Sequence, residues 1–204
     1  MISTKRVKQA KPFVFILLIL PSFLWIYMFF TGTLGINPIE KFMDKLGEMA
    51  LRLIILTLFI SSISDVKFLR SLILLRRMIG LFAFYYVCLH LSAYIILDHF
   101  FNFNFIIKDI IKRPFITFGF ISFIFLIPMA LTSTNNMIKK LGYKVWKKIH
   151  YLIYIIAILA SLHFFMLVRA NKTEPIIYIC IIMLFYLIDL LKNFLFLCWF
   201  GNWV

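Results

Sequence analysis

The sequence has few acidic residues, few glycines and few cysteines. Asp and Glu number 8 among 204 residues, against 22 Lys and Arg, and charged residues make up only 15% of the chain. The 3 cysteines are scattered and form no C-x-x-C pair, which argues against a disulfide framework and an iron–sulfur cluster. So small a share of charged residues also argues against a soluble domain.

Apolar residues are abundant instead. They make up 64% of the chain, 19% of the residues are aromatic, and the mean hydropathy is +1.01, values typical of a polytopic membrane protein. A helix that crosses a membrane needs about 20 mostly apolar residues. Six apolar runs meet this need, at about residues 13–31, 47–64, 78–97, 115–131, 149–168 and 176–191. The sequence therefore predicts an all-α integral membrane protein, a bundle of six transmembrane helices in a single domain over residues 1–204.

The net charge of +14 comes from short basic clusters between these runs. The clusters do not form one continuous basic face, so nucleic acid is not expected as a partner. Fourteen Lys and Arg lie in the N-terminal segment, the loops 65–77 and 132–148, and the C-terminal tail, whereas seven lie in the other three loops. The positive-inside rule then predicts that both termini are cytoplasmic.

One outer loop contains NFIIKDIIKRP, residues 104–114. Its four isoleucines fall on one helical stripe and Lys108, Asp109 and Lys112 on the opposite side, which predicts a short helix lying on the outer membrane surface. His99, just before this segment and beside Asp98, is expected to be a solvated loop residue.

The other three histidines lie within or at the edge of apolar runs. At the helical rise, His90 is 12 residues, about 18 Å, from the inner end of its helix, and His163 is 14 residues, about 21 Å, from the inner end of its own. Both helices run outward, so the two histidines are expected at nearly the same level, in the outer half of the membrane. His150 is expected at the inner edge, at the level of Arg76.

Two imidazoles at one level on parallel helices can bind one iron from opposite sides. Neutral histidine is the usual ligand of haem iron and brings no charge into lipid. We therefore predict His90 and His163 as a ligand pair, with His150 and Arg76 as candidates for a second site. The alternative is that the histidines only bridge neighbouring helices by hydrogen bonds. His150 and His163 are thirteen residues apart, about 140° short of whole turns, so two haems sharing this helix would require local rewinding.

Three stretches of the chain closely resemble the MsrQ family, formerly called YedZ. They are RRMIGLFAFYYVCLHLSAYIILD (76–98), KRPFITFGFISFIFLIPMALTS (112–133) and LGYKVWKKIHYLIYIIAILASLHFF (141–165). The most specific part is the order of TS, LG-x(3)-W and W-x(3)-H in TSTNNMIKKLGYKVWKKIH. The MsrQ family is in turn similar to the transmembrane haem domain of ferric reductases and NADPH oxidases.

This resemblance implies a haem b-containing electron-transfer subunit in the bacterial inner membrane. It implies electrons taken from the quinone pool, or from a cytoplasmic flavin reductase, and passed to a periplasmic molybdenum-containing MsrP-like methionine sulfoxide reductase. FMN is also associated with the family. His90, His150 and His163 match three of the four haem-ligating histidine positions of the ferric reductases, and Arg76 stands at the fourth. One haem is therefore expected, and a second remains open.

One alternative to this hypothesis remains. The alternative is a non-redox membrane protein, such as a small transporter or an assembly scaffold. A reductase that binds its own nucleotide is not expected, because the sequence has no G-x-G-x-x-G turn. The expected redox protein is therefore a relay, which only passes electrons between two partners. Arg52, in the second apolar run, could pair with a haem propionate or extend to the lipid headgroups.

Overall fold

The computed structural model describes residues 4–67 and 69–200, with side chains described up to residue 192. This part of the chain consists of helices and connecting loops and contains no strand. The helices are α1 (Thr4–Phe30), α2 (Pro38–Ser62), the 3₁₀-helix η1 (Arg70–Leu72), α3 (Ile73–Ala93), the π-helix η2 (Tyr94–Asp98), α4 (Phe103–Lys112), α5 (Pro114–Leu131), α6 (Asn135–His150), α7 (Leu152–Leu167) and α8 (Thr173–Phe200).

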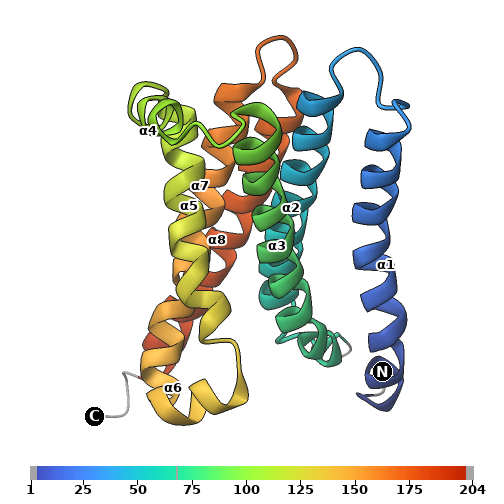
Figure 1. Ribbon diagram of the computed structural model, residues 1–204. Helices are drawn as coiled ribbons and strands as arrows, with labels where there is room; N and C mark the ends of the chain where they lie inside the picture. The colour runs from blue at the N-terminus through green and yellow to red at the C-terminus, as the bar shows by residue number, and fades with distance from the viewer. Residues whose placement is uncertain (1–3, 68, 201–204) are drawn as a thin grey trace.

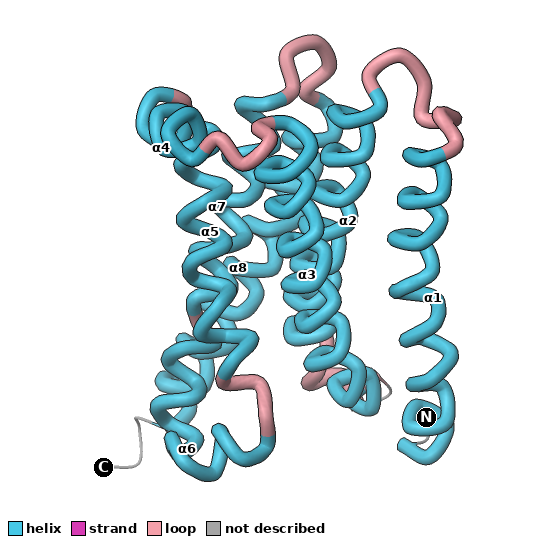
Figure 2. Tube along the Cα trace, in the orientation of Figure 1, coloured by secondary structure: helices cyan, strands magenta, loops and turns pink. Residues whose placement is uncertain are grey.

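Six long helices run alongside one another: α1, α2, α3, α5, α7 and α8 (Figure 1). Helix α4 lies across one end of this bundle, and α6 lies at the other end. The loops gather at the same two ends (Figure 2). Helix α1 begins and α8 ends at the end where α6 lies.

Among the described residues, five helical segments are long and apolar enough to cross a membrane, which supports a multi-pass membrane protein. They are Thr4–Phe30, Arg70–Asp98, Pro114–Leu131, Asn135–Leu167 and Thr173–Lys192. Helix α2 is not among them, because even its last 18 residues include the charged Lys45, Glu48 and Arg52.

Helix α2 nevertheless lies at the centre of the packed core. Leu46, Ala50, Ile54 and Leu58 are each at most 3% exposed, and their spacing of four residues places them on one face of the helix. This helix packs most extensively on α3, and α5 packs most extensively on α7. The bundle is thus built around two closely packed helix pairs, α2 with α3 and α5 with α7.

The predicted loop at 132–148 is wrong for most of its length, because α6 occupies residues 135–150. The Thr134 side chain caps this helix by accepting from Met137 N at 3.2 Å. Gly142 interrupts it, with a φ of 74° that favours glycine.

Helices α6 and α7 are separate, with Tyr151 between them. The amide of Tyr151 donates to both Lys147 O, at 3.1 Å, and Lys148 O, at 3.3 Å, and its carbonyl accepts from Tyr154 N at 3.2 Å, so three-residue contacts accompany the α-helical one at this junction. The predicted run 149–168 therefore contains the end of one helix and all of the next.

The short helix predicted in the outer loop is present as α4, but Asp109 is buried on the same side as Ile106 instead of lying with the exposed lysines. Ile106 and Asp109 are buried, whereas Ile107 and Ile111 are exposed. Asp109 therefore faces the protein, where its Oδ1 lies 3.3 Å from Arg113 Nε.

The prediction that His99 is solvated is also wrong. Its side chain is only 11% exposed, and its ring lies against those of Tyr94 and Phe105. A position in a loop did not imply exposure here, because α4 folds back over this loop.

Candidate functional site

His90 of α3 and His163 of α7 lie side by side inside the bundle. The centres of their rings are 6.2 Å apart, and the ring planes are nearly perpendicular, at 85°. The two residues come from different helix pairs, so this proximity arises where the α2–α3 pair meets the α5–α7 pair. The structure thus brings together the two histidines that the sequence placed at one level.

Each ring is held by a backbone carbonyl of a neighbouring helix. His90 Nδ1 lies 2.9 Å from Met43 O of α2, and His163 Nδ1 lies 2.6 Å from Phe115 O of α5. A carbonyl can only accept a hydrogen bond, so in both rings the proton is on Nδ1. The Nε2 lone pair of each ring is then available to bind a metal.

A glycine lies against each ring. A Cβ added to Gly47 of α2 would be 3.2 Å from Nδ1 and Cε1 of His90, and a Cβ added to Gly119 of α5 would be 3.0 Å from Nδ1 of His163. Sequence reasoning missed both glycines. A signal was available, because glycine is scarce in this chain and each of these two residues lies within or at the edge of an apolar run.

The spacing of the two rings fits a single iron between them. Metal–imidazole bonds are about 2 Å long, so rings bound to opposite sides of one metal ion would have their centres about 6 Å apart. The observed 6.2 Å agrees. Both rings also carry the carbonyl-bonded Nδ1–H that is usual for metal-bound histidine. The donor set is neutral and nitrogen-only, which suits haem iron.

His150 and Arg76 do not join this pair but share a cavity of about 280 Å³ in the other half of the bundle. The cavity lies between α2, α3, α5, α6 and α7. His150 Nδ1 is held by Trp146 O at 3.0 Å, within its own helix, and its ring stacks on the Trp146 ring with centres 4.0 Å apart. The second candidate site therefore has one imidazole and one guanidinium at a shared cavity.

The chain matches known proteins over most of its length. Residues 46–161 match the model of the family described as "Ferric reductase like transmembrane component". A protein of Caulobacter vibrioides named "Protein-methionine-sulfoxide reductase heme-binding subunit MsrQ" is 46% identical over 149 residues, which are 73% of this chain and 71% of the relative. The chain belongs to the MsrQ family.

Further MsrQ proteins are similarly close. The one from Herminiimonas arsenicoxydans is 42% identical over 86% of this chain and 82% of its own length, and the one from Rhodospirillum rubrum is 42% identical over 81% and 79%. The match to the ferric reductase model includes Gly47, His90, Gly119 and His150, and it ends two residues before His163.

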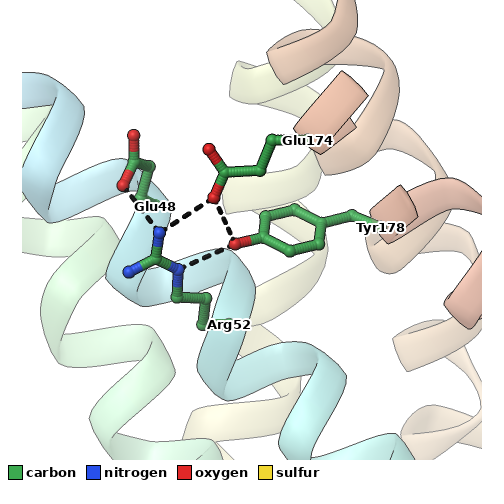
Figure 3. Close-up of polar contacts among 4 residues, drawn as sticks. All are labelled: Glu48, Arg52, Glu174 and Tyr178. Atoms are coloured by element: carbon green, nitrogen blue, oxygen red, sulfur yellow. Dashed lines mark hydrogen bonds and ion pairs between the residues drawn. The ribbon is translucent and has the colours of Figure 1, made fainter. Parts of the chain in front are cut away.

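This MsrQ-family chain also has a polar network at the end of the bundle where α4 lies. Arg52 of α2 donates from Nη2 to Glu174 Oε1 of α8 at 2.9 Å and to Glu48 Oε2 at 3.0 Å, and from Nε to Tyr178 OH at 2.8 Å. Figure 3 shows these contacts and the hydrogen bond from Tyr178 OH to Glu174, 2.6 Å long. Neither of the two interpretations of Arg52, a haem propionate or the lipid headgroups, included this arrangement, in which the guanidinium pairs with the protein's own carboxylates.

A second network ties α8 to the other half of the bundle. Tyr154 OH of α7 donates to Asp189 Oδ2, and Ser62 Oγ lies 3.5 Å from Asp189 Oδ1. Lys192, one turn further along α8, pairs with Asp65 at 2.8 Å. The sequence prediction assigned no role to Asp189, although an acidic residue inside an apolar run is itself a signal.

Asp44 lies on α2 before its apolar part. Burial raises the pKa of this carboxyl to about 6, and the nearby carboxylates of Glu40 and Glu48 add to the shift. This part of α2 includes Met43, whose carbonyl holds His90.

Proposed function

We propose that this protein is a haem b-binding subunit that transfers electrons across the bacterial inner membrane. In this proposal all six long helices cross the membrane, α2 included, as one transmembrane domain with both termini in the cytoplasm. Support comes from the two-to-one excess of Lys and Arg in the segments at the end where α1 begins. Arg52 pairs with Glu48 and with Glu174 of α8 near the end of the bundle where α4 lies, which explains how α2 can carry these charges close to the headgroup level.

The observation that carries this proposal is the pair of rings 6.2 Å apart, each with Nδ1–H on a carbonyl. His90 and His163 would bind the iron through Nε2, one from each side. A bound haem supplies an iron that accepts and releases one electron at a time. The carbonyls of Met43 and Phe115 would orient these two ligand rings.

The electron acceptor follows from the relatives. Their names describe a heme-binding subunit of a protein-methionine-sulfoxide reductase, so the partner would be a catalytic subunit that reduces methionine sulfoxide. We propose a periplasmic molybdenum-containing MsrP-like reductase as this partner, and the quinone pool or a cytoplasmic flavin reductase as the donor. FMN remains a prediction of the family resemblance, with no residue of this chain assigned to it.

The inner cavity would hold the second haem, if one binds. His150 would ligate its iron, and Arg76 would bind a propionate or replace the fourth histidine. Support comes from their common cavity.

The non-redox alternative explains the two Nδ1–carbonyl contacts by helix-bridging histidines. A centre-to-centre distance of 6.2 Å occurs both for packed rings and for two imidazoles on one metal ion, so the haem content of the protein decides between the two functions.

The proposal is tested by the visible spectrum and haem content of the purified protein. Wild type should carry a six-coordinate low-spin haem, and His90→Ala and His163→Ala should lose that species. His99→Gln is the matched control, since it changes a histidine outside the pair and should retain the low-spin haem. Wild type that is folded, obtained in normal yield and free of haem would overturn the proposal.

Haem stoichiometry tests the inner site. His150→Ala should halve the ratio of haem to protein if two haems bind. An unchanged ratio of one would assign His150 a structural role and leave the outer haem in place.

A further inference from the structure

The two histidines are seated in the same way on two different helices. His90 rests on α2, where the accepting carbonyl is that of Met43 and the adjacent glycine is Gly47. His163 rests on α5, where the carbonyl is that of Phe115 and the glycine is Gly119. In both helices the glycine follows the carbonyl residue by four positions, so it lies one turn further on the same face.

We propose that Gly47 and Gly119 are positioning residues for the two ligand rings. This inference rests on the proposed function, in which His90 and His163 bind one haem. Because glycine has no side chain, each imidazole can lie directly against a neighbouring helix and reach a carbonyl one turn earlier. Together the two glycines determine where each Nε2 points and how the two ring planes are turned relative to each other.

The distances show how little room each ring has. A Cβ on Gly119 would be 3.0 Å from Nδ1, 3.1 Å from Cε1 and 3.3 Å from Cγ of His163. A Cβ on Gly47 would be 3.2 Å from Nδ1 and Cε1 of His90, and 3.9 Å from Cγ. Ordinary carbon contacts are about 3.5–4.0 Å, so an alanine would push each ring away by a few tenths of an ångström.

The direction of this push matters for the ligand atom. The Cε1 atom stands between Nδ1 and Nε2 in the imidazole ring, so a ring pressed at Nδ1 and Cε1 must tilt, and Nε2 moves with it. The same tilt strains the bonds from Nδ1 to the carbonyls, 2.6 Å long for His163 and 2.9 Å for His90. His163 has the closer contacts and the shorter hydrogen bond, so Gly119→Ala should have the larger effect.

The effect of an added methyl group on the helix itself is in the opposite direction. Alanine is the better helix former, so Gly→Ala alone favours a helix. If Gly→Ala disturbs the ligand rings while the helices remain stable, the disturbance comes from contact with the rings, because destabilisation of the helix is not its cause.

The test compares Gly47→Ala and Gly119→Ala with wild type and with Gly80→Ala. Gly80 is the matched control for the His90–His163 haem, because it lines the cavity at His150 and its added Cβ would meet only Thr57 Cγ2, at an ordinary 3.6 Å. The readouts are the electron paramagnetic resonance signal of the oxidised haem, its midpoint potential, and the affinity of the haem-free protein for haemin. The signal of the His90–His163 haem is identified as the one that disappears in His163→Ala.

The nearly perpendicular rings, at 85°, should give wild type a strongly anisotropic low-spin signal, because the angle between axial imidazole planes determines this anisotropy. Gly119→Ala should shift that signal and the potential, and weaken haemin binding by about tenfold or more, as loss of a supporting contact to a metal ligand usually does. Gly47→Ala should change the signal, the potential and the haemin affinity in the same sense by less, and Gly80→Ala should leave the signal and potential of the His90–His163 haem unchanged.

The inference is overturned if Gly47→Ala and Gly119→Ala retain the wild-type signal, potential and haemin affinity. It is also overturned if Gly80→Ala changes them equally, since the effect would then come from any added methyl group. Both results would leave the proposed function intact, which fails instead if wild type binds no haem. If Gly119→Ala does not fold, Gly47→Ala carries the test.

Discussion

The network around Arg52 gives the sharpest prediction of stability (Figure 3). Arg52 is bonded to Glu48 in its own helix and to Glu174 and Tyr178 in α8. Only the last two contacts join helices that are far apart in the sequence. Replacing Glu174 by Gln should therefore loosen α8 from α2, whereas replacing Glu48 by Gln should not.

The magnitudes follow from exposure. The side chains of Arg52, Glu48 and Glu174 are 51%, 30% and 46% exposed, so solvent screens them, and each pair contributes at most about 1 kcal/mol. Glu174→Gln should lower the free energy of unfolding by about 1 kcal/mol, because it weakens the bonds to both Arg52 and Tyr178. Glu48→Gln should lower it by about 0.5 kcal/mol or less, as for other pairs four residues apart on a helix.

The assay is equilibrium unfolding in mixed micelles with increasing denaturing detergent. A double-mutant cycle with Arg52→Gln and Glu174→Gln should give a coupling of about 0.5–1 kcal/mol. The coupling should shrink between about 0.1 M and about 1 M salt, since the screening length falls from about 10 Å to about 3 Å. Equal losses for Glu48→Gln and Glu174→Gln, or a coupling of zero, would refute this reasoning.

Two further predictions concern other carboxyl groups. The folded-state pKa of Asp44, about 6, is above its usual 3.8. The folded protein therefore binds a proton more tightly than the unfolded chain, and stability is lost as pH rises from about 4 through 6. Asp44→Asn should raise the melting temperature at a pH well above 6 and leave it unchanged near pH 4, and an equal change at both pH values would contradict this. Tyr154→Phe leaves Asp189 Oδ2 without its donor and should cost about 1–3 kcal/mol of unfolding free energy; the loss should be much smaller in an Asp189→Asn background, and an undiminished loss would show that the hydrogen bond is not its cause.

Hydropathy located the long helices well but misplaced their ends. The predicted run 115–131 agrees closely with α5 (Pro114–Leu131), whereas α1, α2 and α8 extend beyond the apolar runs predicted for them. A membrane helix can extend beyond the hydrocarbon into the headgroup region, and hydropathy does not record that part. Hydropathy also missed helix α6, because its many basic residues are typical of a loop between apolar runs.

Side-chain orientation was harder to predict than depth. His99 was expected in solvent and Asp109 on the polar side of α4. Their side chains are instead only 11% and 9% exposed, and His99 Nε2 lies 3.6 Å from Asp109 Oδ2. Periodicity groups the residues on one side of a helix but does not say which side meets a neighbouring helix, and Asp109 lies on the side of α4 that faces the protein.

The sequence by itself determined that this chain is a helical membrane protein and that His90 and His163 lie at one depth, because hydropathy and helical rise are properties of each segment alone. Only the tertiary structure decided that the two rings stand 6.2 Å apart, that Gly47 and Gly119 give them room, and that two backbone carbonyls hold them. Those contacts depend on which face of each helix meets which neighbour. Side-chain packing across the whole bundle determines that choice, and a backbone carbonyl leaves no mark in the sequence.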